Sequence, residues 1–64
     1  MDDIGTILEL FKPLMTRCEE LDETSYVCIF KTFKDAVTFV DAIKENVPTT
    51  QLLLKGLYVK IVVQ

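Results

Sequence analysis

The last sixteen residues, Thr49 to Gln64, constrain the fold of this chain more than any other segment. They place one apolar run on each side of Lys55-Gly56, and the second run continues almost to the final residue. Two strand-like runs joined by a short segment that contains Gly predict a β-hairpin. We expect no later segment to cover the outer side of this hairpin, and uncovered apolar strand surface in so short a chain suggests a partner.

The length of 64 residues predicts one small domain, residues 1–64. A chain of this size buries only about 60% of its unfolded surface, so a disulfide, a metal or oligomerisation usually adds stability. With no His and two Cys, the chain lacks a zinc-ligand set, and we expect no metal and no cofactor. Half of the residues are hydrophobic and the mean hydropathy is +0.32, which predicts a core plus an interface.

The two cysteines, Cys18 and Cys28, are expected to be reduced, and a disulfide between them is the less favoured state. The N-terminus lacks the basic region and apolar stretch of a signal peptide, which indicates a cytoplasmic protein. Both cysteines also fall on apolar stripes, as small core residues do.

The charge and the hydropathy pattern argue against two classes of partner. The net charge is −3 and the pI about 4.7, whereas binding to nucleic acid or to anionic lipid requires basic surface. No apolar run approaches the roughly 18 residues of a membrane span, so no membrane partner is expected.

Residues 3–21 have the periodicity of a helix, because apolar residues recur at steps of three and four. Asp2 or Asp3 is placed to cap its N-terminus. Pro13 conflicts with a straight helix, since its ring clashes with the carbonyl of Glu9. The stripe stays in phase across Pro13, which favours one kinked helix over two short helices with Pro13 in the first turn of the second. The stripe consists of Ile4, Ile7, Leu8, Phe11, Leu14, Met15, Cys18 and Leu21.

The middle of the chain predicts a strand followed by a second helix. The strand spans Ser25 to Lys31 and is rich in β-branched and aromatic residues. Thr32 and Asp35 then fit a capping-box pattern, and the helix runs to about Asn46, before Pro48. Its apolar stripe consists of Phe33, Ala36, Val37, Phe39, Val40, Ile43 and Val47.

The hairpin strands are predicted at residues 50–55 and 57–63. They are joined either by Lys55-Gly56 as the turn pair or by a slightly longer turn with Gly56 as its left-handed residue. A helix that joins two strands makes them parallel, and the C-terminal strand, the most β-branched, is placed between them. We therefore predict an α+β, two-layer domain in the order helix-strand-helix-strand-strand. Two helices pack on one face of a three-stranded mixed sheet with the C-terminal strand central. Its side chains that face the helices are predicted to be Leu57, Val59, Ile61 and Val63.

Catalytic chemistry is not indicated. Without His, a Ser-His or Cys-His nucleophile cannot form within one chain. Asp35, Asp41 and Glu45 lie on the polar side of the second helix, where paired carboxylates would not converge on a cleft. Gly5 and Gly56 stand alone, so no phosphate-binding loop is present.

The strand, helix and hairpin of roughly residues 26–64 are similar in layout to pterin-4a-carbinolamine dehydratases. That family carries aromatic and Ala spacing like that of Phe33, Ala36 and Phe39 on its long helix, and many members associate through sheet edges. The family's His-His-Pro segment would fall near residues 47–49, where this chain has no His. The resemblance therefore concerns layout and implies no active site here.

These observations predict a non-enzymatic protein–protein interaction module. It would form a homodimer, or bind and modulate a larger protein, through its sheet face or the edge of the C-terminal hairpin. Leu53, Tyr58 and Val62 are the expected apolar contacts, with Lys60 at the rim. So short and mildly acidic a chain would suit a phage- or plasmid-encoded modulator.

Two alternatives belong to other classes. One is a small enzyme or ligand-binding protein whose site is shared between protomers. The other is a weak binder of single-stranded nucleic acid that uses Tyr58, Lys60, Lys55 and Tyr26 as a stacking platform. The acidic net charge makes nucleic acid the less favoured partner.

Overall fold

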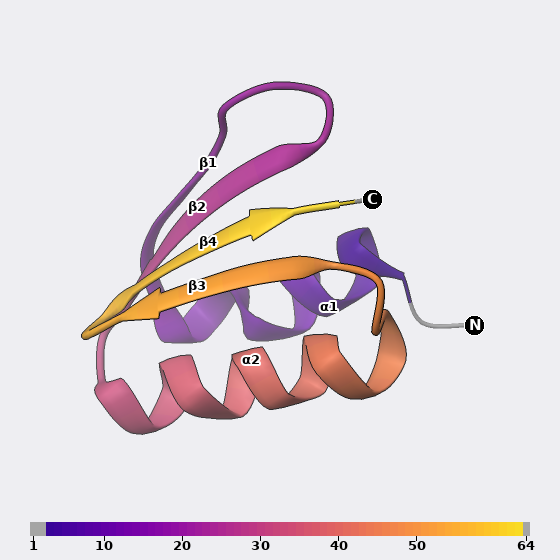
Figure 1. Cartoon of the computed structure of the whole chain (residues 1–64). Helices are drawn as coiled ribbons and strands as arrows, with labels where there is room; N and C mark the ends of the chain where they lie inside the picture. The colour runs from indigo at the N-terminus through magenta and orange to yellow at the C-terminus, as the bar shows by residue number, and fades with distance from the viewer. Residues whose placement is uncertain (1–2, 64) are drawn as a thin grey trace.

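Two helices cover one face of a four-stranded antiparallel sheet (Figure 1). The computed structural model describes residues 3–63. The strands are ordered β1-β2-β4-β3, so β1 and β3 form the two edges. The elements are α1 (Ile4–Phe11), a 3₁₀ turn η1 (Lys12–Leu14), β1 (Met15–Glu20), β2 (Ser25–Phe30), α2 (Phe33–Asn46), β3 (Gln51–Lys55) and β4 (Tyr58–Val62).

The first helix is much shorter than predicted. Asp3 caps it by accepting a 2.9 Å hydrogen bond from the backbone N–H of Thr6, and Asp2 lies outside the described residues. The helix ends at Phe11, and Pro13 lies in the 3₁₀ turn that follows. The prediction of one kinked helix over 3–21 is therefore wrong, because the backbone is extended from Met15 onward. The alternative, with Pro13 in the first turn of a second short helix, fits the 3₁₀ turn η1.

The rest of the predicted helix is strand β1, whose β-bulge explains the error. Met15 pairs with Phe30 and Arg17 pairs with Ile29, so Thr16 is an extra residue in β1. In a regular strand, residues three apart face opposite sides, but one extra residue brings both to the same side. Met15 and Cys18 therefore share the helix-facing side, and their spacing of three resembles that of a helical stripe.

The predicted sheet requires a correction that follows from β1. The sheet has four strands and every neighbouring pair is antiparallel, so it is not a three-stranded mixed sheet. β4 lies between β2 and β3 and is antiparallel to both, as predicted. Because β4 separates β2 from β3, these two strands share a direction without forming a parallel pair.

The core lies between the helices and the sheet, with Phe39 of α2 at its centre. The Phe39 ring packs against Phe11 at 5.2 Å and against Phe30 at 5.0 Å between ring centroids. Phe33 was expected in the core but is 56% exposed, because it is the first residue of α2 and precedes the covered part of the helix. The buried apolar residues are Ile4, Ile7, Met15, Cys28, Phe30, Ala36, Phe39, Val40, Ile43, Val59 and Ile61.

The predicted cap and the left-handed Gly56 are confirmed, but the turn pair is Gly56-Leu57, so Leu57 lies in the turn and is exposed instead of facing the helices as predicted. The hydroxyl of Thr32 accepts a 3.2 Å hydrogen bond from the backbone N–H of Asp35 at the start of α2. Gly56 has φ of +61°, and it forms the β3–β4 turn together with Leu57. A positive φ at only the first turn residue matches a type II′ hairpin, whose twist suits the flanking strands.

Candidate interaction surface

The outer face of the sheet is the surface turned away from the helices. Side chains alternate between the faces of a strand, so the neighbours of buried Cys28 and Val59 point outward. The strand register aligns these outward residues in three rows across the sheet. The Glu19 row consists of Glu19, Val27, Lys60 and Leu53. The Arg17 row consists of Arg17, Ile29, Tyr58 and Lys55, and the Val62 row of Ser25, Val62 and Gln51.

The centre of the outer face is apolar. Val27, Ile29 and Val62 are half-buried by their neighbours on the sheet alone. Leu53 is 55% exposed and Tyr58 is 37% exposed. Sheets that pack on nothing usually alternate apolar residues inward with polar residues outward, so an apolar outer face indicates a second contact.

The four residues that the sequence selected all lie on this face. Leu53, Lys60 and Val62 line a shallow hollow of about 170 Å³, together with Gln51 and Leu52. Tyr58 lies in the neighbouring row, opposite Ile29. Lys60 is half-buried between Val27 and Leu53, and so lies inside the face and not at its rim.

Arg17 and Glu19 are the outer-face residues that the sequence did not reveal, because their strand was predicted as helix. The Nε–H of Arg17 donates a 2.8 Å hydrogen bond to Oε1 of Glu19, and the two form an ion pair on β1. Pro13 was the available signal, since a proline inside a helical pattern often ends the helix. Had the helix been ended there, the alternation of Arg17 and Glu19 with Cys18 would have predicted a strand.

The two edges of the sheet differ in how they could meet another chain. β1 carries the bulge and the charged Arg17–Glu19 pair, and both features discourage strand addition. β3 pairs with β4 in an unbroken register and presents Leu53 outward. The edge of the C-terminal hairpin is therefore the more receptive one for an added strand.

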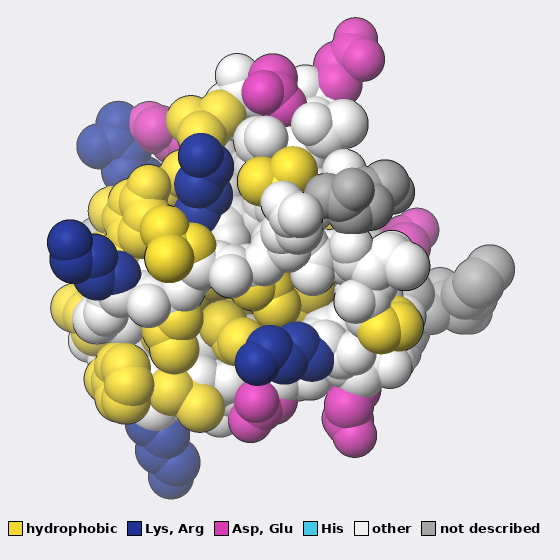
Figure 2. Space-filling model, viewed as in Figure 1, with side chains coloured by type: hydrophobic (Ala, Val, Ile, Leu, Met, Phe, Trp, Pro, Cys, Tyr) yellow, Lys and Arg dark blue, Asp and Glu magenta, His cyan; other side chains and the backbone are white. Residues whose placement is uncertain are grey.

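Apolar surface extends beyond the outer face at one end of the sheet. Figure 2 shows hydrophobic side chains gathered at the left of the view, over the β3–β4 turn and the beginning of α2. Leu57 in the turn is 42% exposed, and Phe33 at the start of α2 is also exposed. The turn thus continues the apolar surface that Tyr58 begins.

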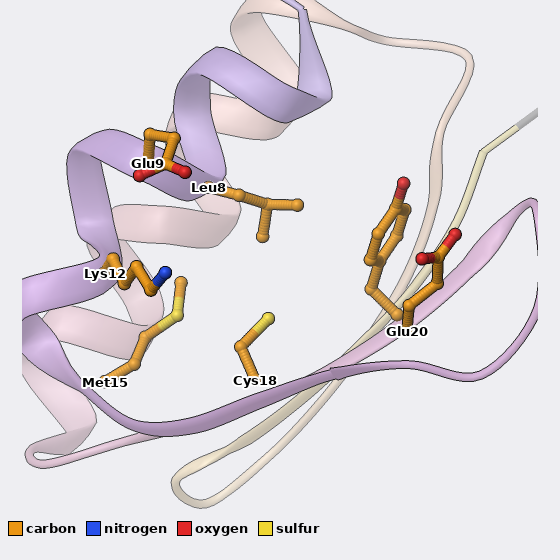
Figure 3. Close-up of a pocket in the computed structure, with 7 residues that line it drawn as sticks. Leu8, Glu9, Lys12, Met15, Cys18 and Glu20 are labelled. Atoms are coloured by element: carbon orange, nitrogen blue, oxygen red, sulfur yellow. The ribbon is translucent and has the colours of Figure 1, made fainter.

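A separate groove of about 390 Å³ lies between α1 and the β1–β2 hairpin (Figure 3). The side chains of Leu8 and Cys18 point into this space. Its charged groups are of mixed sign, since Lys12 is accompanied by Glu9 and Glu20. Within residues 3–63, no cluster of His, Cys, Asp and Glu could hold a metal ion. The complete lining is Leu8, Glu9, Lys12, Met15, Cys18, Glu20 and Tyr26.

Cys18 and Cys28 form a disulfide across β1 and β2, so the expectation of reduced cysteines is wrong. The two residues are directly opposed in the register, and their Cα atoms are 4.0 Å apart. Because Cys18 was predicted in a helix, the prediction did not align it with Cys28 across a pair of strands. Cys28 is fully buried, whereas Cys18 is exposed on the groove side.

Comparisons with protein families, with curated proteins and with solved structures found no match to this chain. The comparisons therefore give no support to the similarity in layout to pterin-4a-carbinolamine dehydratases. None of the helices in the described part of the chain is long and apolar enough to cross a membrane. The geometry of the outer face and of the groove is thus the basis for a functional assignment.

Proposed function

We propose that this chain is a small non-enzymatic protein–protein interaction module that associates through the outer face of its sheet. The observation that carries the proposal is the alignment of Val27, Ile29, Tyr58, Val62 and Leu53 on a face that no helix covers. Removing such surface from water contributes roughly 25 cal/mol per Å². A domain this small gains little from its own core, so covering this face would add substantially to its stability.

The polar residues of the outer face also fit an interface. Arg17 and Glu19 lie on the β1 edge and Lys55 lies on the β3 edge, so charges flank an apolar centre. An apolar centre with a polar rim is the usual anatomy of a protein interface. Lys60 departs from this arrangement, and its long aliphatic stem can pack on the apolar centre while its ammonium group reaches a partner.

The β3 edge provides a second route within the same proposal. An extended segment of a larger protein could pair with β3 through backbone hydrogen bonds and place a side chain beside Leu53. Modulation of a host protein by a phage- or plasmid-encoded chain would fit this mode. Binding through β3 and binding through the face would share Leu53, which is exposed to both.

The groove favours a second candidate function, a ligand-binding protein. Its volume of about 390 Å³ is within the range of small-molecule sites. Loss of ligand binding on Lys12→Ala, with the fold retained, would favour this candidate over an interaction module.

The nucleic-acid alternative would use Tyr58 with Lys60 and Lys55, and it predicts binding that weakens steeply with added salt.

The disulfide bears on the compartment in which the protein acts. Structural disulfides persist in oxidising compartments and are rare in the cytosol. The expectation of a cytoplasmic protein depended on reduced cysteines, so the Cys18–Cys28 pair weakens it. Counting free thiols in protein isolated from its native source would decide between the two compartments.

Solution mass measured by light scattering over a concentration series tests the proposed function. We expect wild-type mass to rise with concentration and Val62→Asp to stay monomeric, because a carboxylate on the outer face opposes apolar contact. Leu10→Asp is the matched control, since Leu10 is 68% exposed on α1, away from the sheet. Equal association by wild type and Val62→Asp would contradict the proposal, provided that circular dichroism shows both folded.

For a larger partner, the same three proteins can be compared by co-purification. Loss of a bound protein with Val62→Asp but not with Leu10→Asp would place the contact on the outer face. Loss with both variants, or with neither, would count against it.

A further inference from the structure

Building on the proposed function, we propose that a second copy of this chain covers the outer face, related to the first by a two-fold axis. The axis runs across the strands, between the Glu19 row and the Arg17 row. Each strand then lies over its own copy in the opposite direction, and the two rows exchange places. Two-fold dimers are the commonest oligomers, and their interface must be complementary to itself.

On the β1 edge, this axis pairs opposite charges. Glu19 of one copy faces Arg17 of the second copy, and Arg17 faces Glu19 in return. The ion pair already present within each chain becomes part of a network of four charges. Networks of this kind contribute more than isolated surface pairs do.

At the centre of the sheet, the same axis matches apolar and aromatic groups. Val27 of one copy lies over Ile29 of the second on β2. On β4, Lys60 lies over the ring of Tyr58, where an ammonium group and an aromatic face attract each other. On β3, Leu53 meets the aliphatic stem of Lys55, whose charge remains in water at the edge.

Other two-fold axes produce mismatches. An axis along the strands places β1 over β3, so that Arg17 faces Lys55 with like charge. It also sets Lys60 over Val27, which offers the ammonium group no partner. An axis between the Glu19 row and the Val62 row sets Lys60 over Val62. Of these three axes, only the first gives every charged residue except Lys55 an opposite charge or an aromatic face.

The size of the face indicates how strong this dimer is. The axis overlays two of the three rows on four strands about 4.8 Å apart, with rows about 7 Å apart, so the overlapping backbone positions span roughly 15 Å by 7 Å. Val62 then lies at the margin of the contact, opposite the β3–β4 turn of the second copy. A contact of this size is at the small end of specific interfaces, so we expect a dimer that dissociates on dilution.

Charge reversal on β1 tests this arrangement. Arg17→Glu gives a chain with two acidic residues on the edge, and Glu19→Arg gives one with two basic residues. In the proposed dimer each variant faces its own like charges, so each alone should associate at least about tenfold more weakly than wild type. An equimolar mixture should form a heterodimer of wild-type affinity, because acidic edges then face basic ones.

The measurement is sedimentation equilibrium of each variant, of the mixture and of the double variant Arg17→Glu/Glu19→Arg. The double variant is the control, because it retains an ion pair within the chain and should associate like wild type. Both side chains are exposed in the monomer, so these changes leave the core intact.

Three results would overturn the inference. A wild-type monomer at all concentrations would exclude the dimer. A mixture no stronger than its components would exclude this axis. Stronger association of Arg17→Glu alone would favour the axis along the strands, where Glu at position 17 would face Lys55. If Val62→Asp still abolishes association in the last two cases, the proposed function stands and only the geometry fails.

Discussion

The two faces of the central strands carry similar residues but differ in what covers them. On the helix side, Cys28, Val59 and Ile61 are completely inaccessible to water. On the outer side, Val27, Ile29 and Val62 remain half-exposed although they occupy neighbouring positions on the same two strands. The comparison shows that β2 and β4 are suited to burial on both sides, whereas one chain covers only one side. A substitution on the covered face should therefore change folding, and one on the outer face should change association.

The largest effect is expected from Ile61→Ala on the covered face. It removes methyl groups from a fully buried site and should lower the free energy of unfolding by about 2–5 kcal/mol, measured by urea denaturation. Val62→Ala, the next residue on the outer face, should cost the dilute monomer less than about 1 kcal/mol. Equal losses for the two variants would contradict the difference between the faces.

Reduction of the Cys18–Cys28 disulfide should have the next largest effect. The cross-link joins residues 10 apart in the sequence, and loss of its loop constraint should lower stability by about 2–3 kcal/mol. The measurement is urea unfolding with and without a phosphine reductant. Cys18→Ala is the control, since its stability should not respond to the reductant. A wild-type midpoint unchanged by reduction would show that the disulfide does not support the covered face.

Gly56→Ala should destabilise the hairpin that carries Leu53 and Tyr58. Gly56 has φ of +61° with no atom within 4 Å of an added Cβ, so the cost is conformational, roughly 1–2 kcal/mol. Gly5→Ala is the matched control: Gly5 is helical, and Ala should stabilise α1 or leave it unchanged. The measurement is the melting temperature of each variant. A melting temperature that falls less for Gly56→Ala than for Gly5→Ala would contradict this prediction.

The smallest effect concerns pH. Hydrogen bonds from the backbone N–H groups of Thr6 and Thr24 lower the pKa of Asp3 and Asp22, because they stabilise the charged carboxylates. Because the pKa of each carboxyl is lower in the folded state, each carboxylate stabilises the fold at pH values above the ordinary pKa of 3.8. This stability is lost as the pH falls through the lowered pKa of the folded state.

Asp3→Asn keeps a side-chain oxygen at the cap and should flatten this acid dependence slightly. Thermal melts between pH 5 and pH 2, compared with wild type, would detect the change. A steeper acid loss in the variant would contradict the assignment of the cap.

The sequence predicted the parts of the fold whose signals are local. Thr32 at the start of α2, Gly56 in the turn and the alternation of β4 each depend on the conformations of a few residues. Strand β1 was missed because the bulge at Thr16 gave Met15 and Cys18 a helical spacing. The partners of a strand depend on tertiary pairing, which a periodicity within one segment does not contain.

The candidate site was predicted in part for the same reason. Leu53, Tyr58, Lys60 and Val62 follow from strand alternation, and the structure places all four on one face. Arg17 and Glu19 required β1 to be known as a strand. The disulfide also required the register of β1 against β2, which sets Cys18 opposite Cys28.

Methyl NMR of the wild-type chain over a dilution series tests the central claim most directly, because it reports both faces in one experiment. We expect the methyl signals of Val27, Ile29 and Val62 to shift with concentration, while those of Val59 and Ile61 stay constant. Constant outer-face signals up to millimolar concentration, or shifts confined to Leu10 on α1, would contradict association through the outer face.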